Sequence, residues 1–323
     1  MLVTGRNGAG KTNLLESLHV GTQGFSPRTR NEAQLVRFGR PGARIVLDGA
    51  RGEVSLRIEV TLQEGAGKRA ALNGATLRSA EQLRSEVATL VFTPDRLGVV
   101  KGGPIVRRAY FDRAVGRLAP AKAPLPAEYA NALAQRNAAL RGGSREAVRP
   151  WTEQVAALGA RLVDARADAL GALAEPFAER AGELGLEDAS LRYQGEPPSV
   201  ALLESRLDRD LERGTTSLGP HLDDIVIAAG ARELRSFGSQ GEQRLAVLAL
   251  LLAEWELIVE RGGIPPLLLL DDVLSELDPG RRRVLAERVA GRGQTLVTAT
   301  DASFLPLEPA QRLEVRDGEV RAA

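Results

Sequence analysis

The first residues that could do chemistry lie at the start of the chain, where residues 5–12 read GRNGAGKT. This is the Gly-x-x-x-x-Gly-Lys-[Ser/Thr] pattern of a phosphate-binding loop, in which glycines let the backbone wrap phosphate oxygens. The lysine of the pattern reaches the β and γ phosphates, and its hydroxyl residue ligates Mg²⁺. We therefore predict a site for a nucleoside triphosphate formed by Gly5, Arg6, Asn7, Gly8, Ala9, Gly10, Lys11, Thr12 and Asn13.

The segments around this loop have the expected character. Met1 to Val3 is apolar and predicts the end of a strand, and residues 12–21 (TNLLESLHVG) have the spacing of an amphipathic helix. The amides and the dipole at the start of that helix would face the anion. A glycine-rich turn without function is the alternative interpretation, and the strand–loop–helix context disfavours it.

A pair of carboxylates supplies a second part of such a site. Residues 265–272 read PPLLLLDD, a continuous apolar run typical of a buried parallel strand whose carboxyl end faces the nucleotide. We predict that Asp271 holds Mg²⁺ through water and that Asp272 orients or deprotonates the attacking water. Alone, such a pair often forms a turn or a helix cap. In residues 295–301 (TLVTATD), another buried strand is expected, where Thr300 or Asp301 would sense the γ phosphate.

A second anion site is predicted at residues 239–243 (SQGEQ), which precede a long apolar helix. A hydroxyl and amides at a helix N-terminus attract anions. One phosphate loop already covers one face of a triphosphate, so the second site suggests a two-fold sandwich in which Ser239, Gln240, Gly241 and Glu242 contact the nucleotide of a partner. An ordinary helix cap at Ser239 is the alternative. Asp278, followed by Pro279, predicts a helix start that could meet a second subunit.

The elements that must position these residues predict an α/β protein. Residues 44–62, continued by RAALNG, alternate as in an antiparallel meander, and a strand ended by Pro94 follows. From Pro104 the spacing becomes helical, with Gly142-Gly143 as the turn of a helical hairpin, and strands resume after Thr215. We therefore expect one ATPase head (1–103 and 216–323) interrupted by a helical lobe (104–215).

Composition limits the classes of function. The 323 residues carry a net charge of +1 and no cysteine, and the longest apolar stretch, 245–259, contains Glu254 and Glu256 and is too short for a membrane span. We expect a buried helix there and a cytoplasmic protein. A DNA-binding surface would have to be local, and the loop before the helical lobe offers Lys101, Arg107 and Arg108. A solvated helix face, or a DNA surface near Arg28 and Arg30, is the alternative.

Several blocks together resemble the RecF family, bacterial recombination and repair ATPases related to SMC and ABC-type proteins. They are GRNGAGKTNLLE, FTPDRLGVVKGGPIVRRAYFD, EYANALAQRNAAL, SLGPHLDDI, SQGEQRLAVLALLLAE, LLLLDDVLSELDPGRR and TATD. The resemblance implies an ABC-type head with a helical lobe, cofactors ATP and Mg²⁺, ATP-dependent dimerisation, and weak DNA-dependent ATP hydrolysis. It also implies DNA binding at single-strand gaps in recombination, repair and replication restart, and partnership with RecO and RecR to help RecA load.

By this resemblance, Lys11 and Thr12 belong to the phosphate loop, 239–243 to the signature motif, and Asp271 and Asp272 to the Mg²⁺ and water-activating pair. Asp278 matches the loop that crosses the dimer interface. Leu222 departs from the family, which usually has arginine there. The family also has about two strands before the phosphate loop, so we expect a shortened N-terminus and a sheet lacking those strands.

Two other classes remain open. An ABC transporter subunit shares the paired motifs, although it normally lacks a long helical insertion and has the signature Leu-Ser-Gly-Gly-Gln. An SMC-like DNA tether would need a much longer coiled coil. Here Pro150, Pro176 and Gly142-Gly143 are expected to break the helical region into short pieces.

Overall fold

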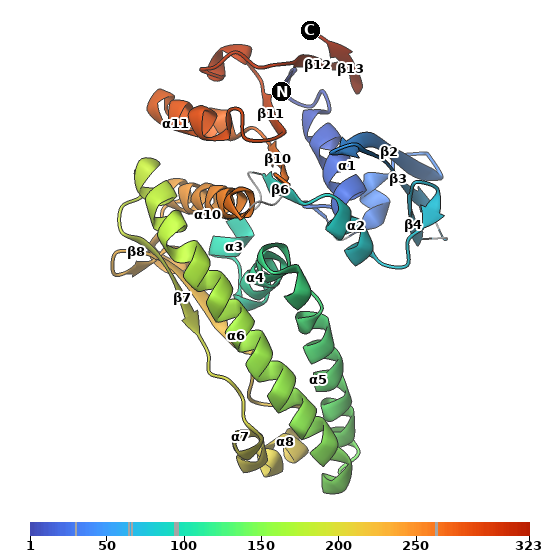
Figure 1. The fold of residues 1–323 in the computed structure, drawn as a ribbon, viewed down its shortest axis with the longest axis vertical. Helices are drawn as coiled ribbons and strands as arrows, with labels where there is room; N and C mark the ends of the chain where they lie inside the picture. Colours follow the sequence, from blue (N-terminus) through green and yellow to red (C-terminus); the bar gives the residue numbers. More distant parts are fainter. Residues whose placement is uncertain (30, 64, 66, 94–96, 262–263) are drawn as a thin grey trace. The chain divides into compact units, whose positions relative to one another are not determined.

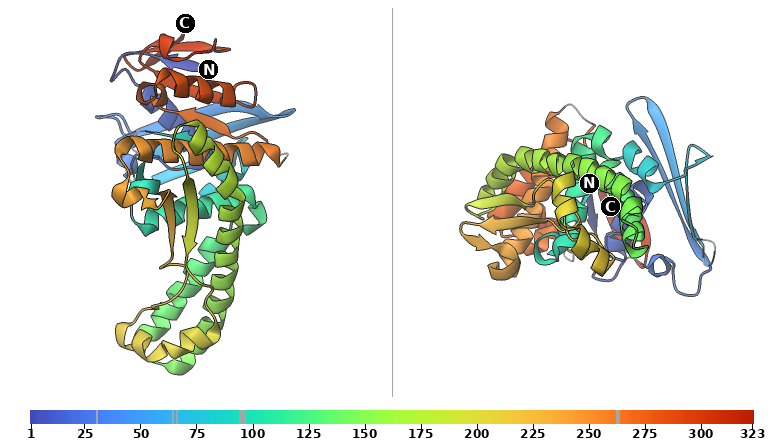
Figure 2. Two further views of the ribbon diagram at one scale, coloured as in Figure 1. Left: turned by 90° about the vertical axis from the view of Figure 1, so that its left-hand side faces the viewer. Right: turned by 90° about the horizontal axis from the view of Figure 1, so that it is seen from below.

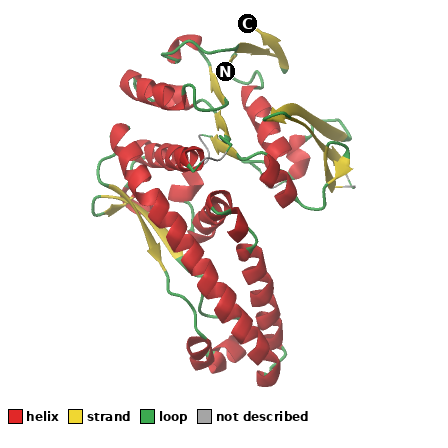
Figure 3. Cartoon of the chain, in the orientation of Figure 1, coloured by secondary structure: helices red, strands yellow, loops and turns green. Residues whose placement is uncertain are grey.

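A computed structural model describes residues 1–29, 31–63, 65, 67–93, 97–261 and 264–323. The chain forms two compact units, one made of Met1–Arg96 with Ile258–Ala323 and the other of Leu97–Leu257. Both larger sheets belong to the first unit, whereas the second consists mainly of helices (Figure 3).

A six-stranded sheet with the order β13-β12-β1-β11-β10-β6 forms the centre of the first unit. All neighbouring pairs are parallel except β12 and β13. Parallel strands end at the same edge of a sheet, so the segments that follow β1, β10 and β11 are brought together. The strands are β1 (Leu2–Thr4), β6 (Thr89–Phe92), β10 (Leu267–Leu270), β11 (Thr295–Ala299), β12 (Arg312–Arg316) and β13 (Glu319–Ala322).

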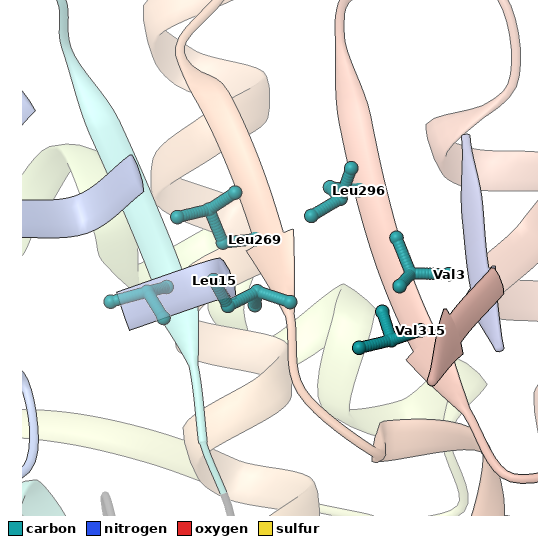
Figure 4. Packing of buried hydrophobic residues seen from close by; sticks show 6 residues of the cluster. Val3, Leu15, Leu269, Leu296 and Val315 are labelled. Atoms are coloured by element: carbon teal, nitrogen blue, oxygen red, sulfur yellow. The ribbon is translucent and has the colours of Figure 1, made fainter. Parts of the chain in front are cut away.

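The core of this unit joins that sheet to helix α1 (Lys11–Gln23), which follows the first strand. Leu15 of α1 packs in one buried cluster with Val3, Leu269, Leu296 and Val315 (Figure 4). Leu268, Leu269 and Leu270 are all fully buried, as expected for a strand covered on both faces. The apolar run before the two aspartates thus forms the predicted buried parallel strand.

A separate antiparallel sheet of four strands confirms the predicted meander: β2 (Gly42–Arg51), β3 (Val54–Gln63), β4 (Gly67–Leu72) and β5 (Ala75–Thr76). Ile58 and Val60 of β3 pack against Val20 of α1 and Leu83 of α2 (Ala80–Glu86), which lie beside the sheet in Figure 1. The predicted end of the preceding strand at Pro94 lies outside the described residues. Further elements of this unit are η1 (Glu32–Leu35), η4 (Val273–Glu276), α11 (Pro279–Val289) and η5 (Ala302–Phe304).

The second unit is built on a helical hairpin, α5 (Leu125–Arg141) and α6 (Arg145–Glu183), drawn in green in Figure 1. Its turn is at Gly142-Gly143, as predicted, and Gly143 has a left-handed φ of 72° that glycine adopts without strain. The other helices are α3 (Gly98–Lys101), α4 (Pro104–Leu118), η3 (Pro120–Lys122), α7 (Val200–Ser205), α8 (Leu207–Arg213), α9 (Leu234–Phe237) and α10 (Gln240–Glu260).

The expectation that prolines break the helical region is wrong, since α6 runs for 39 residues through Pro150 and Pro176. A proline inside a helix removes one backbone hydrogen bond and crowds the preceding turn. Pro150 lies near the start of α6, and buried side chains flank both prolines, including Thr152, Leu173 and Phe177. The buried apolar face of α6 therefore offsets the two local defects.

The second unit also contains a small sheet, in which two strands confirm that strands resume after Thr215 and one, at residues 189–194, was not predicted. Strand β7 (Ala189–Gln194) pairs antiparallel with β8 (Asp224–Ala229), which pairs with β9 (Arg232–Glu233). The left view of Figure 2 shows β7 and β8 side by side near α6. Because β8 pairs with β7, residues 216–257 group with the helical region, and the second division between the units falls within α10 instead of at residue 215. Two short helices, α7 and α8, connect this sheet's first two strands.

Ion pairs tie the elements of the second unit together. Arg107 of α4 makes a bidentate pair with Asp224, at the start of β8, with N–O distances of 2.7 and 2.6 Å. Arg166 of α6 pairs in the same way with Asp112 of α4. The side chain of Arg107 is 2% exposed, so the Asp224 carboxylate compensates a buried positive charge.

Replacing Asp224 by alanine is expected to lower the free energy of unfolding by about 3–5 kcal/mol, because a buried guanidinium is left uncompensated. Urea denaturation followed by circular dichroism measures the change. Asp168→Ala is the matched control, since Asp168 forms an exposed pair with Lys122 and its loss should cost no more than about 0.5–1 kcal/mol. If both substitutions lowered the free energy of unfolding equally, the buried charge of Arg107 would not need the Asp224 carboxylate.

Candidate nucleotide-binding site

The phosphate loop lies between β1 and α1, as the sequence predicts. Residues 5–10 leave the carboxyl end of β1, and α1 begins at Lys11. Gly8 and Gly10 have left-handed φ values of 81° and 111°, which glycine adopts without strain. The amide of Ala9 donates to the carbonyl of Arg6 at 3.1 Å, which closes the loop into a turn in front of the helix.

The ammonium of Lys11 is held by the loop itself. Its Nζ donates to the carbonyl oxygens of Gly5 at 2.7 Å and Arg6 at 3.2 Å, and the side chain is buried. A cation at the start of a helix, beside a loop of backbone amides, is the arrangement that binds a chain of phosphates. To bind a nucleotide, the Lys11 ammonium therefore has only to replace its two hydrogen bonds to carbonyl oxygens with hydrogen bonds to phosphate oxygens.

The C-terminal hairpin supports this loop from a distant part of the sequence. The amide of Gly318, in the turn between β12 and β13, donates to the carbonyl of Ala9 at 2.9 Å. A Cβ atom at Gly5 would lie 2.5 Å from the carbonyl oxygen of Val315 in β12. The first glycine of the motif is thus required by the close approach of a neighbouring strand, which the sequence did not predict.

Asp271 lies next to Thr12, as required of two residues that share a metal ion. Its Oδ1 accepts hydrogen bonds from Oγ1 of Thr12 at 3.2 Å and from Oγ1 of Thr298 at 2.7 Å. Burial raises the pKa of Asp271, the two hydroxyl donors oppose that rise, and the charge of Asp272 adds to it. One hydroxyl and one carboxylate beside a phosphate site fit Mg²⁺, which takes few protein ligands and completes its shell with phosphate and water oxygens.

Asp272 has the features of a residue that handles water. It has a left-handed φ of 47°, and its amide donates to Oγ1 of Thr298 at 2.9 Å. Its Oδ1 is buried and has no hydrogen-bond partner among the residues the structure describes. A buried carboxylate oxygen without a donor is costly unless a further group occupies the position next to it. The geometry therefore suits the orientation of a water molecule.

Thr298 positions both aspartates, although the sequence alone did not single it out. Its fully buried hydroxyl donates to Asp271 and accepts from the backbone of Asp272. The signal was present as a polar residue inside the buried strand TLVTA. Thr300, proposed instead, is exposed one residue beyond β11, and Asp301 caps η5 by accepting from the amide of Ser303. A role of Thr300 in sensing phosphate stays a prediction.

In the second unit, Ser239 and Glu242 form a reciprocal cap at the start of α10. The Ser239 hydroxyl accepts from the Glu242 amide at 3.2 Å, and the Glu242 carboxylate accepts from the Ser239 amide at 2.7 Å. These bonds from Ser239 lower the pKa of Glu242. The cap leaves three residues exposed, Ser239, Gln240 and Gly241. The predicted contact between these residues and a phosphate bound to a partner is therefore sterically possible and stays a prediction. Asp278 caps α11, as expected, by accepting from the Arg281 amide.

The predicted basic cluster needs a correction. The prediction that Arg107 contacts DNA is wrong, because its side chain is buried and binds Asp224 and the carbonyl of Gly102. Lys101 is exposed at the end of α3, and the half-buried Arg108 donates to the carbonyl of Asp223 at 2.5 Å. Of the alternative pair, Arg28 binds Glu16, and Arg30 lies outside the described residues.

Comparisons with known proteins agree with this site. A sequence model described as the RecF/RecN/SMC N terminal domain matches residues 1–313. The DNA replication and repair protein RecF of Anaeromyxobacter dehalogenans (strain 2CP-C) is 40% identical over 342 aligned positions, which cover 99% of this chain and 91% of that protein. The RecF proteins of Myxococcus xanthus and Bacillus cytotoxicus are 38% and 34% identical and cover 94% and 99% of this chain and 85% and 91% of their own lengths. The chain belongs to the RecF family.

Solved structures support the same assignment. The recombination mediator protein RecF with ATP superimposes with a TM-score of 0.88 and 27% identity, covering all of this chain and 91% of that one. The Smc head domain of Pyrococcus furiosus, with a TM-score of 0.58 and 15% identity, covers all of this chain and 89% of its own and shares the fold. These likenesses confirm the predicted ABC-type ATPase head with a helical insertion. Family membership decides against a transporter subunit, and no helix within the described ranges is long and apolar enough to cross a membrane.

Thr298→Val removes the hydroxyl and keeps the shape of the side chain. We expect nucleotide affinity to change little, since Lys11 is unaffected, and single-turnover hydrolysis to fall by about 10- to 100-fold because both aspartates lose their support. Thr298→Ser should restore the rate. Thr295→Val is the control, because Thr295 lies at the other end of β11. Wild-type hydrolysis in Thr298→Val would show that this hydroxyl does not position the pair.

Proposed function

We propose that this RecF-family chain is an ATP-dependent DNA-binding protein of recombinational repair and replication restart. It dimerises on ATP at single-strand gaps and, with RecO and RecR, helps RecA load, while weak DNA-dependent hydrolysis resets it. One observation carries the proposal: Lys11, Thr12, Asp271 and Asp272 gather at the carboxyl edge of one parallel sheet. The names of the similar proteins, DNA replication and repair protein RecF and RecF-ATP in the RecFOR pathway, support it.

The phosphate loop and the helix that follows it supply the contacts for the nucleotide. The amides of the loop and of the first turn of α1 face the phosphates, and the helix dipole adds to their attraction. Lys11 neutralises charge on the β and γ phosphates. Thr12 and Asp271 would hold Mg²⁺, which supplies positive charge between the phosphate oxygens.

Hydrolysis depends on Asp272. Its unpartnered Oδ1 accepts a hydrogen bond from a water molecule and orients it toward the γ phosphate. The exposed Ser239 hydroxyl and the first amides of α10 form an anion-binding helix terminus on the second unit. We propose that this terminus binds the γ phosphate held by a second copy, so that hydrolysis requires the dimer and acts as a switch.

A mixing experiment tests the composite site. Ser239→Arg keeps an intact phosphate loop but places a bulky cation at the signature, and Lys11→Ala keeps the signature but loses the phosphate contact. In analytical ultracentrifugation with ATP present, neither protein alone should dimerise. The mixture can form one complete site per dimer, so we expect heterodimers with about half of the wild-type hydrolysis per dimer if the sites are independent.

The outcome of Ser239→Arg alone decides the proposal. Normal ATP-dependent dimerisation of this variant would reduce Ser239 to the helix cap seen in the structure. Glu212→Arg, a substitution of an exposed residue of α8, is a control for the added charge and should dimerise as the wild type does.

DNA binding is tested at Lys101 and Arg108, the two members of the basic cluster that reach the surface. Replacing both by alanine should weaken duplex binding and reduce the slope of log K against log salt by about 0.9 for each lost phosphate contact. Lys122→Ala with Arg149→Ala removes the same charge from exposed positions elsewhere in the unit. Equal slopes for the two double variants would place the DNA surface elsewhere.

A further inference from the structure

The segment between η1 and β2 displays an aromatic ring at the corner of a tight turn. Residues 37–40 read Arg-Phe-Gly-Arg, and the amide of Arg40 donates to the carbonyl of Arg37 at 3.0 Å. Gly39 has a φ of 77°, the value that the third residue of a type II turn requires. Phe38 is the second residue of this turn and is 103% exposed. The backbone therefore fixes the position of a ring that is fully exposed to solvent.

Two exposed arginines, Arg37 and Arg40, flank this ring. Within the described residues neither side chain joins an ion pair or a hydrogen bond. Two exposed arginines of the neighbouring meander differ, because Arg44 pairs with Glu59 and Arg57 pairs with Asp48. Burial or pairing within this unit therefore does not explain the Arg-Phe-Gly-Arg sequence.

A hollow of about 390 Å³ lies beside the turn. Val36 and Leu62 give it apolar walls, and Gln63 contributes an amide that can donate and accept hydrogen bonds. Glu32 also lines it, but its carboxylate is paired with Lys68. An apolar wall with one amide suits a flat group that has hydrophobic faces and polar edges, which describes a nucleobase.

We propose that this turn and hollow bind single-stranded DNA, with one base stacked on Phe38 and the flanking phosphates contacted by Arg37 and Arg40. Exposed aromatic rings between cationic side chains are how proteins hold single strands without reading their sequence. The inference rests on the DNA binding proposed above and adds to it a specific subsite on the first unit.

The site selects single strands for a physical reason. In a duplex both faces of each base are covered by neighbouring bases, so Phe38 has no free face on which to stack. An unstacked base can reach the ring and the hollow together. A subsite of this kind would recognise the single-stranded side of a gap, while the Lys101 and Arg108 surface contacts backbone phosphates of either form.

The test uses the full chain, a labelled oligothymidylate longer than about 16 nucleotides, and a duplex of the same length, with fluorescence anisotropy over a salt series. Phe38→Ala should weaken oligothymidylate binding by about 5- to 150-fold, the effect of losing one stacked base, without changing the salt slope. Duplex binding should stay the same. Phe38→Trp should bind oligothymidylate at least as well as the wild type. An unchanged melting temperature of Phe38→Ala verifies that the fold is intact.

The arginines give an independent readout. Arg37→Ala with Arg40→Ala should flatten the salt slope for oligothymidylate by about 0.7 for each lost contact. Arg44→Ala with Arg57→Ala is the matched control, since it removes two exposed but paired arginines from the same unit and should leave the slope near that of the wild type.

The outcomes separate this inference from the proposed function. The subsite would be overturned, while DNA binding stands, if Phe38→Ala bound oligothymidylate as tightly as the wild type does. It would also be overturned if the substitution weakened binding of single strand and duplex equally. If the turn binds a protein partner instead of DNA, Phe38→Ala should bind oligothymidylate as the wild type does. No DNA binding by the wild type, with or without ATP, would overturn both.

Discussion

The parallel pairing of β1, β10 and β11 is the constraint on which the nucleotide site depends. Three segments separated by up to about 290 residues of sequence end at one edge of one sheet, and the pairing of these strands brings them there. The site then follows from short local features: glycines that permit the loop, a lysine at the first position of a helix, and two aspartates after a buried strand. Thr298 joins them by sharing one hydroxyl between both aspartates.

Charge is used differently in the two units. In the second unit, arginines such as Arg107 and Arg166 are buried and matched by carboxylates, so they link α4, α6 and β8 and are not available to a ligand. Buried pairs of this kind fix which elements meet, because a mispaired charge in the interior costs several kcal/mol. In the first unit, Arg37 and Arg40 are exposed, and no ion pair joins either of them to another described residue. The abundance of arginine in this chain therefore does not by itself indicate nucleic-acid binding, and burial separates the structural residues from the candidate contacts.

The signature segment shows how one geometry serves two roles. The Ser239 hydroxyl accepts from the amide of Glu242, and the Glu242 carboxylate accepts from the amide of Ser239, which is sufficient to explain both side chains as a cap. The same cap holds the hydroxyl exposed at the positive end of a 21-residue helix. A structural role in the single chain is thus compatible with a role toward a second copy, and only association measurements distinguish the two.

The sequence by itself determined what depends on neighbours along the chain. The phosphate loop, the buried strand before Asp271, the meander and the caps are local patterns of spacing and conformation, and family resemblance supplied the fold. Tertiary structure decided what depends on partners far away in sequence. It placed the hydroxyl of Thr298 beside the two aspartates, because the pairing of β10 with β11 brings the strands together. It buried Arg107 against a carboxylate 117 residues away, and it carried α6 through two prolines because packing of a long apolar face outweighs local propensity.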